Sequence, residues 1–147
     1  MMTEEEYATR TIAQIKAAYA HRPVPMHPGK SAALWFKGRV AADLTADDWH
    51  GREHALHDFS VEAFCYYLQS VLRVAITDEG FPPLVRGLLD RLDGTHNLHF
   101  HHLHHLTRPE LNAIRHCLHL LSYRPEIGDD PVRQPMRTVI RTRPTVH

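Results

Sequence analysis

Helix-start signatures recur along this 147-residue chain and constrain its fold more than any other feature of the sequence. In a capping box, the side chain of a Ser or Thr accepts a hydrogen bond from the backbone N–H three residues later, and the acidic side chain at that later position accepts from the backbone N–H of the Ser or Thr. A hydrophobic staple often accompanies it, in which the apolar residue before the cap packs on an apolar residue in the first turn of the helix. Four segments match all or part of this pattern, beginning at Thr3, Thr45, Ser60 and Thr107. Because each start implies a helix behind it, the pattern predicts a helical chain.

Apolar periodicity supports the same fold class. In the segments 7–19, 61–76, 84–92 and 111–121, apolar residues recur with the spacing of one helix face. A proline or glycine follows each segment closely and is expected to end the helix. We therefore expect an all-α fold, with a single compact, irregular domain of about five helices over residues 1–127.

Three other segments are predicted to lack a regular α-helix. Residues 22–31 contain three prolines and predict a loop. The aromatic segment 34–40 is interpreted as a buried extended segment or a helix end, because a lone two-stranded ribbon is marginally stable. Residues 128–147 are rich in Arg and Pro and are expected to form an irregular C-terminal tail.

Composition argues against several functional classes. Lys plus Arg and Asp plus Glu both number 17, so the formal net charge is zero, whereas domains that bind nucleic acid are usually basic. No apolar run approaches the roughly 18 residues that span a membrane, and the N-terminus lacks the regions of a signal peptide. Two cysteines do not make a secreted disulfide framework. We expect a cytoplasmic protein whose partner is neither membrane nor nucleic acid.

Histidine is abundant, with 14 residues in the chain. His50 and His54 stand at i, i+4, which would place both rings on one helix face, and His57 follows closely. His101 and His105 show the same spacing in a second cluster. A zinc or nickel site is therefore one alternative. Solvated surface histidines are the favoured interpretation, because no Cys pair or His-Glu-x-x-His motif accompanies them.

Two groups of side chains are candidates for contact with another protein. Tyr66 and Tyr67 are adjacent in a helical segment, so that one can be buried while the other lies at the surface as an interface anchor. Arg137, Arg141 and Arg143 lie in an acid-free part of the tail, where they could contact an acidic partner. No residue is assigned a catalytic role.

Cys65 carries the remaining alternative, a small Cys/His-dependent enzyme. Such an enzyme needs a thiolate nucleophile, a histidine base and a group that orients the base. No local catalytic signature surrounds Cys65, and its apolar, periodic segment is typical of a reduced core cysteine.

The middle of the chain carries a set of motifs that resembles a known family. Residues 35–39 read WFKGR, residues 59–72 read FSVEAFCYYLQSVL and residues 106–110 read LTRPE. These segments resemble an uncharacterised bacterial family of small helical proteins with a PEAFxYYLP-type helix and a later helix that begins LTPEQ. The resemblance covers about residues 33–123. This chain differs at Val61 and Gln69, where the family has proline.

The family has no assigned activity, so the resemblance implies no catalytic residue. Small helical proteins of this type often accompany bacterial toxins as accessory or immunity proteins. We therefore favour a non-enzymatic protein-binding module, and in its most specific form an immunity- or antitoxin-like protein that masks a toxin or effector. A histidine-rich metal-binding protein and a Cys/His enzyme stay open as alternatives.

Overall fold

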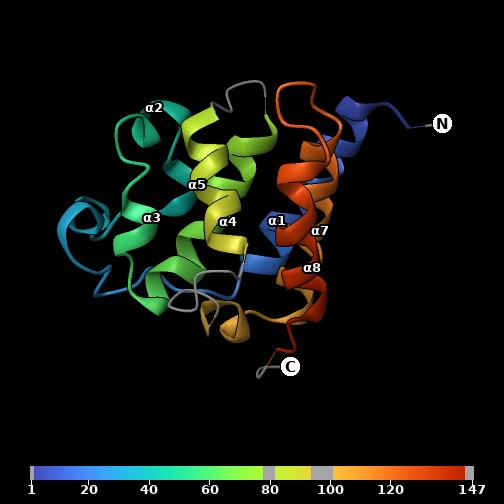
Figure 1. Ribbon diagram of the computed structural model, residues 1–147. Coiled ribbons are helices and arrows are strands. Elements are labelled where there is room, and N and C mark those ends of the chain that lie inside the picture. The colour runs from blue at the N-terminus through green and yellow to red at the C-terminus, as the bar shows by residue number, and fades with distance from the viewer. Residues whose placement is uncertain (1, 78–81, 94–100, 145–147) are drawn as a thin grey trace.

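The computed structural model describes residues 2–77, 82–93 and 101–144. Helices dominate this part of the chain, and its extended pairing is limited to an isolated bridge between Gly29 and Phe59. The predicted all-α fold is confirmed. The longer helices are α1 (Glu4–Tyr19), α4 (Val61–Ile76), α5 (Pro82–Leu92), α7 (Arg108–Ser122) and α8 (Asp130–Arg141) (Figure 1).

The predicted helix starts are present as hydrogen bonds. Thr3 Oγ1 and Ser60 Oγ each accept from the backbone N–H three residues on, at 3.1 Å. At Thr107 both halves of the capping box form, because Glu110 Oε1 also accepts from the Thr107 N–H at 2.7 Å. Asp48 accepts from the Thr45 N–H in the same way. These bonds join residues that are close in sequence, which is why a sequence pattern can predict them.

Shorter helices complete the part of the fold that the structure describes. They are η1 (Ser31–Phe36), η2 (Ala41–Asp43), α2 (Ala46–Trp49), α3 (Ala55–Asp58) and η3 (His101–His105), and of these η2 and η3 contact α4. The segment 34–40 is predicted to be either extended or the end of a helix. Its first residues, 34–36, form the last part of the 3₁₀ helix η1. Phe36 closes this helix inside the core, where its ring centroid lies 4.7–5.2 Å from those of Trp49, Phe59 and Tyr67.

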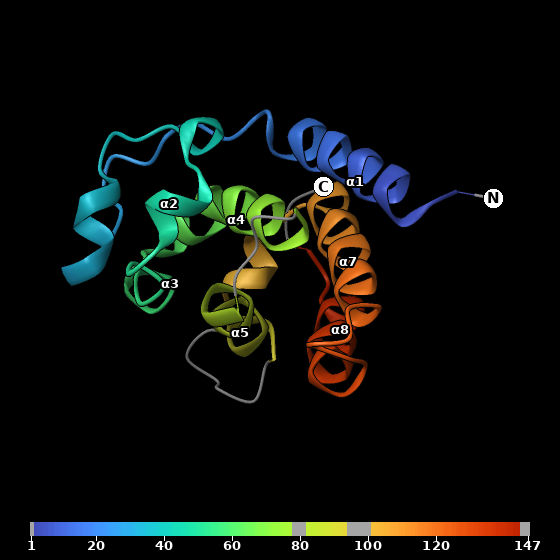
Figure 2. The same ribbon diagram turned by 90° about the horizontal axis from the view of Figure 1, so that it is seen from above.

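Helix α4 lies at the centre of the molecule. It contacts α1, α5 and α7, as well as η2 and η3, and most of its side chains are buried. Figure 2 shows α7 between α1 and α8 on one side of α4, with the short helices α2 and α3 on the other. A helix that is apolar around most of its circumference requires such cover on several faces.

The loop between α1 and η1 is attached to the start of α4. The Ser60 N–H donates to Pro28 O at 2.8 Å, and the Ser60 hydroxyl donates to His27 O at 2.7 Å. Gly29 pairs with Phe59 beside them, at φ 132°. A side chain on Gly29 would place its Cβ 2.1 Å from Asp58 O, so this close approach of two backbones requires glycine.

The expectation of an irregular tail after residue 127 is wrong. Residues Asp130–Arg141 form α8, which packs on α5 and α7. Val132 and Val139 belong to the hydrophobic core, and Pro135 is buried between them in sequence. Pro131 lies in the first turn, where no backbone donor is needed. Burial of this apolar face outweighs the hydrogen bond that Pro135 cannot donate.

Among the described helices, none is both long enough and apolar enough to cross a membrane.

Candidate functional site

The outer side of α8 carries a row of exposed arginines, which we call the arginine face. Arg133, Arg137 and Arg141 follow one another at i, i+4 and i+8, so successive guanidinium groups stand one helical turn apart, with the exposed Ile140 beside them. Residues 131–144 contain four arginines and no Asp or Glu. The face is therefore a concentrated positive surface on a chain whose formal net charge is zero.

The structure brings together two of the three arginines that the sequence singled out. Arg137 and Arg141 share the arginine face, and Arg133 extends it, although Arg133 also pairs with Asp130 at 3.2 Å. Arg143 lies past the helix end and is exposed, and its carbonyl oxygen is 3.1 Å from His104 Nδ1. The sequence predicts a solvated or partner-binding tail for these residues, whereas the structure places Arg137 and Arg141 on a regular helix.

The expectation that Tyr66 or Tyr67 lies at the surface is wrong. Both side chains are buried, because η2 packs on this end of α4 and Phe36 of η1 packs on Tyr67. The Tyr66 hydroxyl accepts from the Ala41 N–H at 3.0 Å. The Tyr67 hydroxyl donates to Phe36 O at 2.5 Å, and Arg39 O lies 2.8 Å from the same hydroxyl. The two tyrosines hold the short helices to α4 and do not face a partner.

The proposed i, i+4 arrangement of His50 and His54 is also wrong. Helix α2 ends at Trp49, and Gly51 turns the chain with φ 77°, so the two histidines flank a turn between two helices. In the ranges 2–77, 82–93 and 101–144, no group of three or more His, Cys, Asp or Glu residues is placed to hold a metal ion.

The other histidines of the alternative metal site have separate environments. Burial, followed by the charge of Arg91, lowers the pKa of His57. His105 is exposed, and its carbonyl oxygen accepts from Arg22 at 2.8 Å. The side chain of His101 lies outside the described residues.

Cys65 is placed for packing. Its side chain is fully buried in α4, and burial raises the pKa of the thiol to about 12. Burial also raises the pKa of Cys117, the second free cysteine. A nucleophilic cysteine needs an accessible thiolate at neutral pH, and neither residue provides one.

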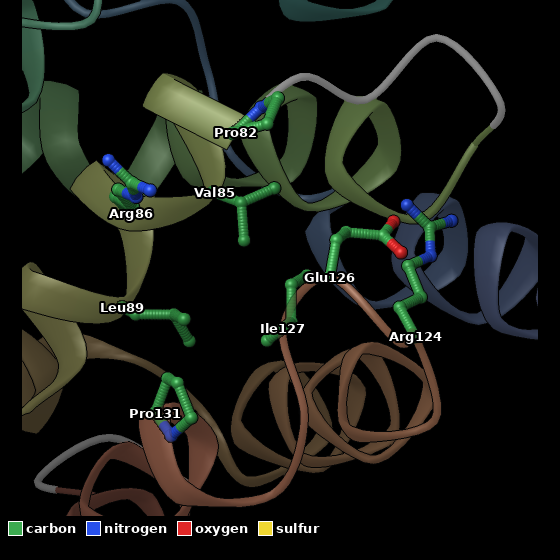
Figure 3. A pocket seen from close by; sticks show the side chains of 8 residues that line it. All are labelled: Pro82, Val85, Arg86, Leu89, Arg124, Glu126, Ile127 and Pro131. Carbon is green, nitrogen blue, oxygen red and sulfur yellow. The ribbon is translucent and has the colours of Figure 1, made fainter.

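A pocket of about 330 Å³ lies between α5 and the turn that joins α7 to α8 (Figure 3). Its walls are mostly apolar. Side chains from α5, the turn and the start of α8 line it: Pro82, Val85, Arg86, Leu89, Arg124, Glu126, Ile127 and Pro131. Pockets of this size and character are typical ligand-binding recesses.

Polar groups border this pocket on two sides. Arg86 lies on α5 and is exposed, whereas Arg124 and Glu126 come from the turn. Arg124 donates to the Ala75 and Thr77 carbonyl oxygens at 2.9 and 3.3 Å, where α4 ends. These bonds satisfy carbonyls that a helix C-terminus leaves open, and they fix the guanidinium in place.

Sequence reasoning missed the pocket for a simple reason. Its walls come from segments around residues 82–89, 124–127 and 131, which only the tertiary packing of α5, α7 and α8 brings together. The prolines at positions 82 and 131 mark helix starts in the sequence, but nothing in their spacing indicates a shared recess.

Comparisons of the chain with protein-family models, with curated proteins and with solved structures find no match. The resemblance of residues 33–123 to a bacterial family therefore stays a prediction, and the function is argued from the side chains described above.

Proposed function

We propose that this protein is a non-enzymatic binding module that docks an acidic surface of another protein through the arginine face of α8. One observation carries the proposal: an exposed helix face presents three arginines and Ile140, and after Asp130, which pairs with Arg133, residues 131–144 contain no Asp or Glu. Arginine is enriched at protein interfaces, and complementary charge accelerates and orients association.

The character of the arginine face favours a protein over a nucleic acid as partner. Ile140 is 57% exposed beside Arg137 and Arg141, and an apolar side chain among cations has a use in a protein interface. The formal net charge of the whole chain is zero, so there is no general basic excess to follow a phosphate backbone.

A partner of this kind is consistent with an immunity- or antitoxin-like role, in which the module masks a toxin or effector. The support is the positive arginine face, which an acidic surface of a toxin or effector would complement. Burial of Cys65 and Cys117 argues against the alternative of a Cys/His enzyme. A zinc- or nickel-binding role has less support, because the described histidines of its proposed site lie in separate environments.

Charge reversal tests the docking surface. The variant Arg137→Glu/Arg141→Glu is compared with Lys16→Glu/Arg115→Glu, which makes the same change in net charge at exposed positions on α1 and α7. Affinity purification from the native host should recover a stoichiometric protein partner with wild type and with the control, and lose it with the α8 variant. Equal recovery with both variants, or no stoichiometric partner at all, contradicts the proposal.

Two further measurements separate the specific forms of the proposal. Co-expression with the product of a neighbouring toxin-like gene should restore growth for wild type and for the control variant, and should fail for the α8 variant. Binding of a random DNA or RNA duplex with the steep salt dependence of phosphate contacts would instead assign the arginine face to nucleic acid.

A further inference from the structure

We propose that the pocket between α5 and the α7–α8 turn binds a large apolar side chain that is carried on a peptide backbone. This site differs from the arginine face in position and in chemistry, and the inference does not depend on that face. The occupant that fits is a leucine-, isoleucine- or phenylalanine-like residue of a peptide or of a protein segment.

The apolar walls of the pocket would contact and bury the side chain of this occupant. Val85 and Leu89 of α5 lie across the pocket from Ile127 of the turn, and Pro82 and Pro131 extend the walls at the two helix starts (Figure 3). A cavity of about 330 Å³ has room for one bulky aliphatic or aromatic group with the backbone atoms attached to it. Burial of such an anchor supplies most of the affinity at protein–peptide contacts.

The polar groups of the turn can form hydrogen bonds with the peptide backbone of this occupant. Arg124 has five N–H donors, of which the Ala75 and Thr77 carbonyls take up two. Glu126 is exposed and forms no hydrogen bond or ion pair with another described residue. A peptide unit offers one C=O acceptor and one N–H donor, so a single backbone amide can use both a guanidinium and a carboxylate.

Simpler ligands match this set of groups less well. A hydrocarbon would leave the guanidinium and the carboxylate unused at the pocket. A plain anion would meet the negative charge of Glu126, and a plain cation would meet Arg86 and Arg124. Only a dipolar group attached to an apolar body complements both the walls and the turn.

Internal hydrogen bonds and packing hold the walls of the pocket in place. The turn is closed by the Ile127 and Gly128 N–H groups, which donate to Arg124 O at 3.0 and 2.9 Å, and Gly128 has the left-handed φ of 76°. Arg124 is tied to the end of α4, and Leu89 and Val85 are buried in α5. A preformed site of this kind loses little conformational entropy on binding.

A titration with small amides tests the proposal on the full chain. The probe is N-acetyl-leucine N-methylamide, followed by methyl NMR signals of Val85, Leu89 and Ile127. We expect saturable shifts at these methyl groups with a Kd of about 1–10 mM, as is typical of a fragment. N-acetylglycine N-methylamide, which lacks the side chain, and isopentanol, which lacks the amide, should each bind at least about threefold more weakly.

Single substitutions identify the groups that recognise the probe. Glu126→Ala should weaken binding of the leucine amide about threefold or more, and Ile127→Ala about tenfold. The controls are Glu5→Ala and Leu34→Ala, an exposed acid and an exposed apolar residue on α1 and η1, which should bind as wild type does. Unchanged methyl spectra away from the pocket show that each variant is folded.

Two results would overturn the proposal directly: no saturable shift at the pocket methyl groups, or equal binding of the glycine amide and the leucine amide. A protein that binds free leucine and does not bind the leucine amide would also overturn it, because that result would indicate an amino-acid site. The variant Arg137→Glu/Arg141→Glu should bind the leucine amide as wild type does. Loss of partner docking by that variant and loss of amide binding by Ile127→Ala are therefore separable results.

Discussion

Arg22 and Glu110, which lie 88 positions apart in the sequence, form an ion pair whose carboxylate is fully buried. Arg22 follows α1, and Glu110 lies in the first turn of α7, where it also accepts from the Thr107 N–H. One guanidinium nitrogen of Arg22 contacts Glu110 Oε1 at 2.7 Å and also donates to His105 O. This pair ties the end of the first helix to the start of the α7 helix.

Removing the charge of Glu110 should therefore destabilise the protein. Breaking one partner of a buried pair leaves the other uncompensated, so Glu110→Gln should lower the free energy of unfolding by about 3 kcal/mol. The matched control is Asp130→Asn, which breaks the exposed pair with Arg133 and should cost at most about 1 kcal/mol. Urea denaturation of both variants checks this, and equal losses would show that burial of Glu110 has no energetic consequence.

A glycine substitution tests the attachment of the first loop to α4. Gly29→Ala should cost more than about 3 kcal/mol, because its Cβ would lie 2.1 Å from Asp58 O and the backbones would have to separate. Gly51→Ala is the control, since Gly51 also has positive φ but open space around it, and should cost about 1 kcal/mol. Thermal and urea unfolding would reveal the difference, and two similar costs would contradict the close approach at Gly29.

Acidic pH should destabilise the protein through His116. Burial, and then the charges of Arg115, His119 and Arg10, lower the pKa of His116 below its ordinary value of 6.5. Neutral His116 therefore contributes stability above about pH 6.5, and this contribution is lost as the pH falls from there through the folded-state pKa, because the unfolded chain binds the proton more readily.

The measurement is the free energy of unfolding between pH 7.5 and pH 5. His116→Gln, which can still donate to Gln14, should show a smaller decline over this range than wild type. An identical pH dependence in the two proteins would exclude His116 as a source of acid sensitivity. His57 has its pKa shifted in the same direction, so some decline should persist in the variant.

Both cysteines should be unreactive while the protein is folded. Burial raises the pKa of Cys65 to about 12, and Cys117 is fully buried as well. Iodoacetamide at pH 7.5 should modify neither residue in native protein and both in urea, as intact mass would show. Rapid modification of Cys65 in native protein, absent in Cys65→Ala, would contradict this prediction and support the alternative of a Cys/His enzyme.

Arg91 should be replaceable with a gain in stability. Its side chain is almost completely buried over the ring of Phe64, and its guanidinium nitrogens have no hydrogen-bond partner in the part of the chain that the structure describes. Burial lowers the pKa of Arg91 to about 10, which means that desolvation of the charged guanidinium reduces the stability of the folded protein. Arg91→Met should stabilise the protein by about 1 kcal/mol or more.

The comparison for this gain is Arg86→Met on the exposed side of α5, which should change stability by less than about 0.5 kcal/mol. Urea denaturation measures both. A net loss of stability in Arg91→Met would show that the buried guanidinium is stabilising where it lies.

The parts of the fold that could be predicted depend on local interactions. Thr3, Ser60 and Thr107 cap helices by bonding to backbone three residues away, so a short sequence pattern contains all the information. Apolar periodicity predicted α1, α4, α5 and α7 for the same reason. By contrast, the i, i+4 spacing of His50 and His54 predicts one helix, whereas the turn at Gly51 separates the two residues.

The parts that could not be predicted depend on distant partners. The prolines predict an irregular tail after residue 127, and only contact with α5 and α7 makes α8 a stable helix. Tyr66 and Tyr67 are buried by η1 and η2, whose 3₁₀ turns carry little periodicity. The pocket at Leu89 and Ile127 joins segments that lie far apart in the chain. For the candidate site, the sequence predicts Arg137 and Arg141 as contact residues, but it does not predict that they share one face of a helix.

Helix α8 keeps its core contacts and its arginine face at separate positions. Val132, Pro135 and Val139 attach the helix to the rest of the protein, whereas the arginine face takes no part in that attachment. Exchange of the outer positions should therefore cost at most about 1 kcal/mol, the value expected for the exposed Arg133–Asp130 pair. If the arginine face binds a partner as proposed, its specificity can change in evolution while the scaffold stays constant. A library randomised at positions 133, 137, 140 and 141 would sample new binding specificities on one unchanged backbone.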